Sequence, residues 1–245
     1  NERLFNSEKF QNIIECLNKN KKGNICGLVN SSKSNVLYGI FEKLNKNVFI
    51  ITSSSFEAKN IYEDLRFYTD ECIYYQGKES IFYNIEAFSP DIKWERIKAF
   101  RKICEDSPKI VCISVDSLVS LYMDKIKTQN LYLTLKENTE YEFENLLREI
   151  HNLGYEKVHK VEQKGQYATR GGIIDVFPIN TSCPYRVEFF GDTLDKIRSF
   201  NITTQMSVDN CSEINLIQAK EFILTREEKE RLYENLKRDF DKHIS

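Results

Sequence analysis

A run of short predicted β-strands around residues 165–201 constrains the fold of this chain more than any other feature. Ile173 to Phe177 is rich in β-branched and aromatic residues, and Pro178 ends it because proline cannot donate to a strand ladder. A second strand is predicted from Tyr185 to Phe190. The turn residues Gly191-Asp192 then lead into a third strand around Asp195 to Phe200. This stretch therefore predicts a small antiparallel sheet.

The alternation of side chains along the second strand predicts two different faces. Val187 and Phe189 share one face, and Arg186, Glu188 and Phe190 share the other. Because arginine and aromatic residues dominate protein–protein hot spots, the second face has the composition of a protein-binding patch. On periodicity alone, an ordinary sheet whose outer face happens to carry Arg and Glu is the commoner case.

Arg170 is expected at a strand edge, facing solvent. It precedes Gly171-Gly172, a pair that is typical of a turn or bulge in which the backbone needs a positive φ.

Composition excludes several classes of function. The chain has 245 residues, enough for one to three domains, and a formal net charge of −2, which argues against nucleic-acid binding through a broad basic face. Its seven cysteines form no Cys-x-x-Cys pair, and its three histidines lie far from them, so no zinc site is predicted. Because it shows no signal peptide and no apolar run of about 20 residues, we expect a cytosolic protein without membrane contact.

Residues 27–34 resemble a phosphate-binding loop between a predicted strand, Asn24 to Val29, and a helical pattern that runs through Leu44. Gly27, Lys33 and Ser34 fit the Gly-x-x-x-x-Gly-Lys-Ser pattern, but Ser32 replaces the second glycine. A Cβ at that position would crowd the ring of backbone N–H groups that binds phosphate. No later carboxylate pair follows to hold magnesium. We therefore expect a degenerate loop without ATP. The open alternative is an ATPase fragment in which Lys33 still binds nucleotide.

Strands and helices alternate in the first half of the chain. The apolar strands Val48 to Ile51 and Ile110 to Val115, separated by helical patterns, predict parallel strands with right-handed crossovers. The polar segment Lys125 to Asn130 is the expected junction to a second domain. Near the other end, Thr225 and Glu228 have the spacing of a capping box for a final helix.

Two stretches resemble the UvrB-homology module of the transcription-repair coupling factor (Mfd) family. The first reads Arg170-Gly-Gly-x-x-Asp-x-Phe-Pro, followed by Arg186-x-Glu-x-Phe-Gly-Asp-x-x-Asp-x-Ile-Arg, and the second spans Glu79 to Phe100. The resemblance implies an α/β fold: a degenerate, helicase-like parallel-sheet domain derived from a phosphate-loop fold, with an inserted small α+β domain that has an antiparallel sheet. The implied divisions are 1–126, 127–212, and 213–245 returning to the first domain.

The resemblance also implies recruitment without catalysis. In this family the module binds UvrA, and the contact residues correspond to Arg170, Arg186 and Phe190, with Glu188 as a weaker candidate. ATP, magnesium, RNA polymerase and double-stranded DNA are expected only at other domains of a full-length protein. Met206 stands where the family has an arginine.

The remaining alternative is a DNA-binding module like UvrB itself, with Tyr83, Phe88 and Trp94 stacking on bases. The absence of a long tyrosine-rich hairpin and the near-zero net charge argue against it.

Overall fold

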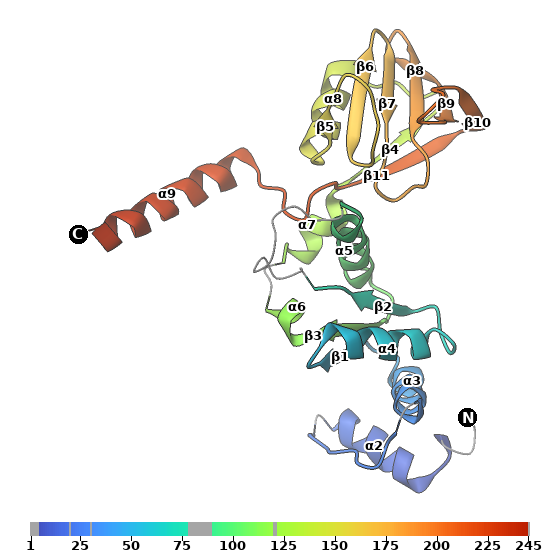
Figure 1. Cartoon of the computed structure of the whole chain (residues 1–245), viewed down its shortest axis with the longest axis vertical. Helices are drawn as coiled ribbons and strands as arrows, with labels where there is room; N and C mark the ends of the chain where they lie inside the picture. The colour runs from blue at the N-terminus through green and yellow to red at the C-terminus, as the bar shows by residue number, and fades with distance from the viewer. Residues whose placement is uncertain (1–4, 20, 30, 78–89, 120–121, 245) are drawn as a thin grey trace. The chain divides into compact units, whose positions relative to one another are not determined.

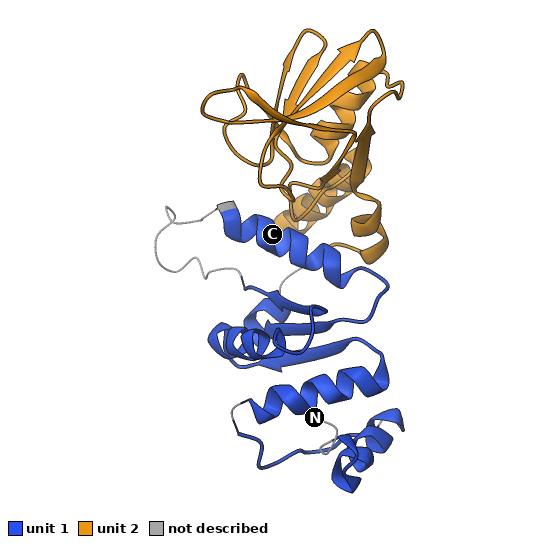
Figure 2. Ribbon diagram, turned by 90° about the vertical axis from the view of Figure 1, so that its right-hand side faces the viewer, with its two compact units in different colours: residues 1–121 blue, residues 122–245 orange. Residues whose placement is uncertain are grey.

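The computed structural model describes residues 5–19, 21–29, 31–77, 90–119 and 122–244. The chain divides into two compact units, residues 1–121 and 122–245 (Figure 2). The elements of each unit are labelled in Figure 1. None of the helices that the described residues form is both long and apolar enough to cross a bilayer.

Unit 1 is built around a small parallel sheet whose strand order is β1-β3-β2. Its described elements are α2 (Glu8–Asn18), α3 (Ser32–Leu44), β1 (Val48–Thr52), α4 (Ser55–Leu65), β2 (Cys72–Tyr75), α5 (Pro90–Ile103), β3 (Ile110–Ser114) and α6 (Val115–Leu118). The central strand β3 pairs with a strand on each edge, and every residue in it is buried. The parallel pairing predicted from the alternation of strands and helices is confirmed.

The expected strand at Asn24 to Val29 is wrong, because no strand forms between residues 21 and 29. Gly27 adopts a positive φ of 82°, which interrupts an extended conformation. Ile25 and Val29 remain exposed, so burial of apolar side chains does not compensate. The strand that should precede the phosphate loop is therefore missing.

The second stretch of family resemblance is described only from Pro90 onward, where α5 begins. Tyr83 and Phe88 lie outside the described residues, and Trp94 is a half-buried residue of α5.

Unit 2 contains a six-stranded sheet of order β10-β9-β8-β7-β6-β5 and a two-stranded sheet of β11 and β4. Its elements are α7 (Lys125–Asn130), β4 (Tyr132–Lys136), α8 (Phe143–Asn152), β5 (Glu156–Lys157), β6 (Gln166–Arg170), β7 (Ile173–Val176), β8 (Tyr185–Phe190), β9 (Thr193–Phe200), β10 (Ser207–Cys211), β11 (Glu213–Ile217) and α9 (Arg226–Ile244). Only β5 pairs in parallel; the other neighbours are antiparallel. The three strands predicted from residue 173 to residue 200 are confirmed as β7, β8 and β9.

One face of the six-stranded sheet forms the core of unit 2. Ile174, Val187 and Ile197 are opposite one another on β7, β8 and β9, and all three are fully buried. Helix α8 lies against this face, where the ring of Phe143 meets that of Phe189 at 5.3 Å between centroids. We call this the inner face and the opposite side of the sheet the outer face.

The observed division differs in two ways from the expected one. The units separate at 121/122 rather than 126/127, because α7, at the expected junction, groups with unit 2. The strand expected to return to the first domain, β11, instead pairs with β4 over five residues, from Glu213 opposite Lys136 to Ile217 opposite Tyr132. Since β4 belongs to unit 2, this pairing makes β11 part of the same unit.

Candidate protein-binding face

Every predicted partner-binding residue lies on the outer face of the six-stranded sheet. Cross-strand neighbours point to the same side of a sheet, so the register defines two rows on this face. One row is Arg170, Ile173, Glu188 and Lys196, and the next is Asp175, Arg186, Arg198 and Asn210. Phe190 lies two residues after Glu188 on β8 and therefore belongs to the same face. Four basic side chains thus share this face with two carboxylates, which makes it locally positive on a chain whose net charge is −2.

Arg170 and Phe190 occupy equivalent positions at the ends of two hairpins. Each is the last residue of its strand and is followed by a glycine, Gly171 or Gly191, with a φ of 62°. Because β6 and β8 run in the same direction on either side of β7, both hairpin turns lie at one end of the sheet. The two hairpin turns are separated by two strand spacings, roughly 10 Å.

These two side chains are also the most accessible of the predicted set. Phe190 is 85% exposed. Arg170 is exposed and forms no ion pair with any described residue. An exposed phenyl ring at the same end of the sheet as an unpaired guanidinium offers a partner both an apolar anchor and a bidentate donor.

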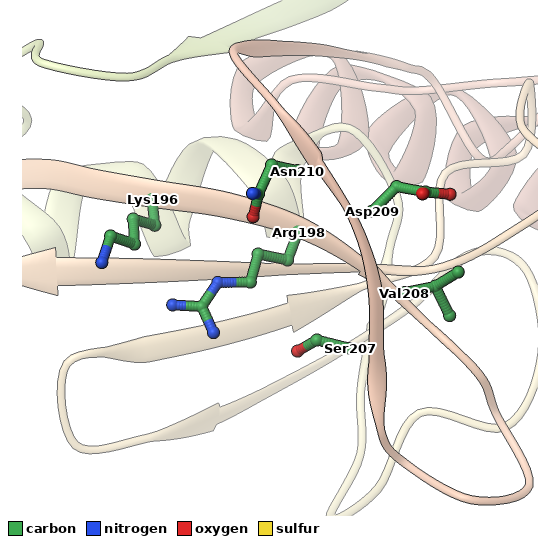
Figure 3. A pocket seen from close by; sticks show the side chains of 6 residues that line it. All are labelled: Lys196, Arg198, Ser207, Val208, Asp209 and Asn210. Carbon is green, nitrogen blue, oxygen red and sulfur yellow. The ribbon is translucent and has the colours of Figure 1, made fainter.

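A polar hollow of about 380 Å³ lies at the β9–β10 side of the same face. It is lined by Lys196, Arg198, Ser207, Val208, Asp209 and Asn210 (Figure 3). The Lys196 and Arg198 side chains point to one side of the strands, whereas the Asp209 carboxylate is turned to the other side. The cationic groups therefore set the charge of the hollow's open side.

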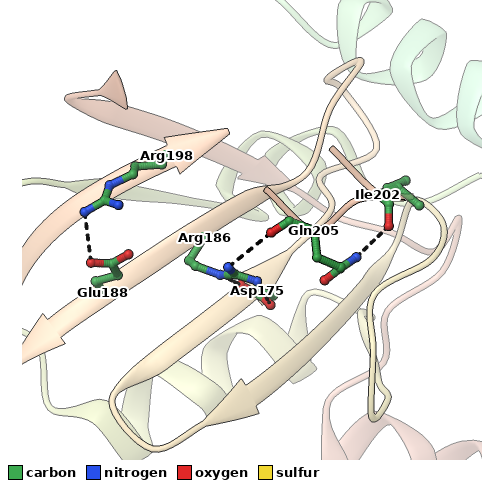
Figure 4. Close-up of polar contacts among 6 residues, drawn as sticks. All are labelled: Asp175, Arg186, Glu188, Arg198, Ile202 and Gln205. Carbon is green, nitrogen blue, oxygen red and sulfur yellow. Dashed lines mark hydrogen bonds and ion pairs between the residues drawn. The ribbon is translucent and has the colours of Figure 1, made fainter. Parts of the chain in front are cut away.

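Glu188 and Arg186, the other two predicted residues, have partners within the sheet (Figure 4). Arg198 Nη2 lies 3.3 Å from Glu188 Oε2, and both side chains are about 30% exposed. Arg186 donates from Nε and Nη2 to the two carboxylate oxygens of Asp175, at 2.7 and 2.8 Å. This is the fork geometry that makes Arg–carboxylate pairs strong and directional.

Arg186 is held from three sides. Besides Asp175, its Nη1 donates to the carbonyl of Gln205 at 3.5 Å, and its guanidinium carbon lies 5.0 Å from the centre of the buried Phe200 ring. The hydrogen bonds with Asp175 raise the pKa of Arg186 above its ordinary value. With a side chain only 20% exposed, Arg186 joins the sheet to the loop before β10 and presents little free surface.

Comparison with known proteins shows what this sheet is similar to. Residues 133–222 match the family model of the UvrB interaction domain. The transcription-repair-coupling factor of Bacillus subtilis (strain 168) is 28% identical over 233 residues, which cover 94% of this chain. That of Staphylococcus aureus (strain bovine RF122 / ET3-1) is 27% identical over 229 residues, 90% of this chain. Residues 133–222 are therefore similar to a UvrB interaction domain, and the chain as a whole is similar to part of the transcription-repair-coupling factors.

This result confirms the family resemblance read from the sequence. The matched region begins within β4 and extends past β11, so it includes the whole outer face. The chain spans about a fifth of the length of the curated relatives that it matches.

Sequence reasoning missed three charged residues of the UvrB interaction domain. Asp175 and Arg198 stand inside the quoted family motif, and Lys196 lies two residues before Arg198, yet none was singled out. Their importance depends on which strand residues face one another: Asp175 meets Arg186, and Lys196 meets Glu188, across neighbouring strands. The charge pattern of the predicted strands could have indicated the second pair.

The region of the expected phosphate loop forms a different set of contacts. Ser32 Oγ accepts a hydrogen bond from the Val29 N–H at 2.9 Å and starts α3. Ser34 is 1% exposed, and its hydroxyl donates to Asp64 Oδ2 of α4 at 3.4 Å. Lys33 is exposed. The hydroxyl that would face magnesium in a working loop is therefore used for packing between helices.

No cluster suited to a metal ion is present in the part of the chain that the structure describes, counting groups of three or more His, Cys, Asp or Glu.

Proposed function

We propose that this chain is a non-catalytic module of a transcription-repair coupling factor that binds UvrA, and so recruits nucleotide excision repair to a stalled RNA polymerase. The observation that carries the proposal is the exposed Phe190 on the same face of the UvrB interaction domain as Arg170 and Arg186. A large aromatic side chain left in water beside basic groups is typical of an interface anchor.

The four predicted residues have two kinds of role in this proposal. Phe190 fills an apolar pocket of UvrA, and Arg170 pairs with a carboxylate there, because both side chains are accessible. Arg186 is engaged by Asp175, so we propose that it contributes its exposed edge and keeps the sheet and the neighbouring loop in place. Glu188 orients Arg198.

A pull-down of purified UvrA by the immobilised chain tests the proposal. We expect the wild type to retain UvrA and Arg170→Ala to retain much less. Arg226→Ala removes a highly exposed arginine from α9 and serves as the control, with retention equal to the wild type. Equal retention by all three proteins would reject the role of Arg170, and no retention by the wild type would reject the function.

We also propose that unit 1 is a degenerate helicase-like domain that binds neither ATP nor magnesium. Three features support this. No strand forms at Asn24 to Val29, Ser32 adds a Cβ where a glycine is needed, and the Ser34 hydroxyl is buried. Titration with a fluorescent ATP analogue should show no saturable, magnesium-dependent signal. A saturable signal that disappears in Lys33→Ala would contradict it.

The remaining partners follow from the same proposal. RNA polymerase, double-stranded DNA, ATP and magnesium are assigned to other domains of the full-length protein, which acts in the cytoplasm as an ATP-dependent translocase. For a UvrB-like DNA-binding activity of this chain, salt-dependent retention of a DNA duplex would be the distinguishing result.

A further inference from the structure

The hollow between β9 and β10 holds more positive charge than its own carboxylates neutralise. Lys196 is exposed and forms no ion pair with any described residue. Arg198, on the same side of β9, forms one ion pair with a described residue, that with Glu188 at 3.3 Å. Glu188 also stands directly opposite Lys196 in the register. Two cations therefore share a single carboxylate.

Asp175 and Asp209, the carboxylates on the neighbouring strands β7 and β10, do not supply the missing negative charge. Asp175 is fully engaged by Arg186, which is the cross-strand neighbour of Arg198. The Asp209 carboxylate is directed away from Lys196 and Arg198 (Figure 3). The lining also includes the neutral hydrogen-bonding side chains of Ser207 and Asn210, together with Val208. The hollow thus offers two cations and two neutral polar side chains to whatever enters it.

We propose that this hollow is a second anchor site, which receives an aspartate or glutamate side chain from the protein that binds Phe190. The inference rests on the proposed function, in which that protein is UvrA. Lys196 lies opposite Glu188, two residues along β8 from Phe190, so the hollow is continuous with the candidate protein-binding face. Glu188 supplies one negative charge for the two cations Lys196 and Arg198. A partner carboxylate placed between them would supply the second.

The chemistry favours a protein carboxylate over a DNA phosphate. Non-specific DNA binding depends on Lys and Arg side chains that together neutralise several phosphates. The outer face has four basic side chains, and two of them, Arg186 and Arg198, already contact carboxylates. A few excess charges beside an exposed phenyl ring suit a protein interface, where they set orientation and association rate.

Measured UvrA affinity over a range of salt concentrations tests the second anchor. Lys196→Glu should weaken binding roughly tenfold at low salt and flatten the salt dependence, because a charge that steers association is reversed. Lys196→Arg should bind like the wild type. Lys229→Glu makes the same change at an exposed α9 lysine and should have no effect.

Cross-linking gives a readout that a general charge effect would not produce. A carbodiimide joins lysine amines to nearby carboxylates without a spacer, so the wild-type complex should yield an amide between Lys196 and one acidic residue of UvrA. Lys196→Arg keeps the charge but has no reactive amine, and that product should be missing from its complex. Mass spectrometry of the digested complex identifies both residues.

The outcomes separate the two proposals. If Phe190→Ala weakens UvrA binding while Lys196→Glu behaves like Lys229→Glu, the second anchor is wrong and the proposed function stands. The anchor is equally overturned if Lys196 forms no cross-link, or if Lys196→Glu reduces retention of a DNA duplex instead of UvrA. If the wild type binds no UvrA, both proposals fail.

Discussion

At the scale of single residues, the candidate face separates side chains that are available to a partner from side chains that hold the sheet. Phe190 and Arg170 are accessible, whereas Arg186 and Asp175 form a largely buried ion pair at the margin of a small apolar cluster that includes Phe200. Replacing a residue of the first kind should affect binding alone. Replacing one of the second kind should affect folding first.

Arg186→Ala should lower the free energy of unfolding of unit 2 by about 2–3 kcal/mol. The change leaves Asp175, a residue that is 6% exposed, without its cation, and an unpaired buried charge is costly. Urea denaturation of the two proteins measures the difference. Arg170→Ala, in the next row of the same face, should leave stability within about 0.5 kcal/mol of the wild type. Similar stability for Arg186→Ala would contradict the structural role of the pair.

At the scale of elements, two hairpins determine where the accessible residues lie. The β6–β7 and β8–β9 turns place Arg170 and Phe190 at one end of the sheet, and each turn depends on a glycine with positive φ. No atom lies within 4 Å of the position that a Cβ would take on Gly191, so the cost of a side chain there is purely conformational.

Gly191→Ala should lower stability by about 1 kcal/mol and also weaken UvrA binding, because the turn next to Phe190 must rearrange. Asparagine tolerates the left-handed region better than alanine does, so Gly191→Asn should lose less stability and less UvrA affinity than Gly191→Ala. Thermal unfolding and UvrA affinity of the two variants measure this. A Gly191→Ala protein with wild-type stability and affinity would contradict the dependence on the turn.

The sequence predicted this sheet well because its signals are local. Strand composition, Pro178 and the glycine turns predict β7, β8 and β9, and the period of two correctly places Arg186, Glu188 and Phe190 on one face. The partners of those residues depend on long-range register, which no local pattern gives. The strand expected at Asn24 to Val29 failed for a related reason: an apolar run becomes a strand only where a neighbouring strand can pair with it.

At the scale of the whole molecule, all of the proposed binding chemistry lies in one unit. Every residue of the candidate face belongs to residues 122–245, and unit 2 has its own buried core on the inner face of its sheet. Unit 1 has a separate parallel-sheet core and contains residues 27–34, which we propose are a degenerate phosphate loop.

A fragment of residues 122–245 should fold alone and bind UvrA within about threefold of the affinity of the whole chain, since a domain with its own core can fold independently. Circular dichroism and the same affinity measurement test this. A folded fragment that binds far more weakly would show that unit 1 takes part in recognition.

The most direct test of the account is the affinity of UvrA for Phe190→Ala, measured beside Phe67→Ala. Phe67 is 87% exposed in unit 1, so it matches Phe190 in chemistry and accessibility but lies outside the UvrB interaction domain. We predict that Phe190→Ala loses at least about 30-fold in affinity, corresponding to about 2 kcal/mol, with unfolding unchanged, and that Phe67→Ala binds like the wild type. Equal affinities for the two variants would contradict the claim that this face is the UvrA-binding surface.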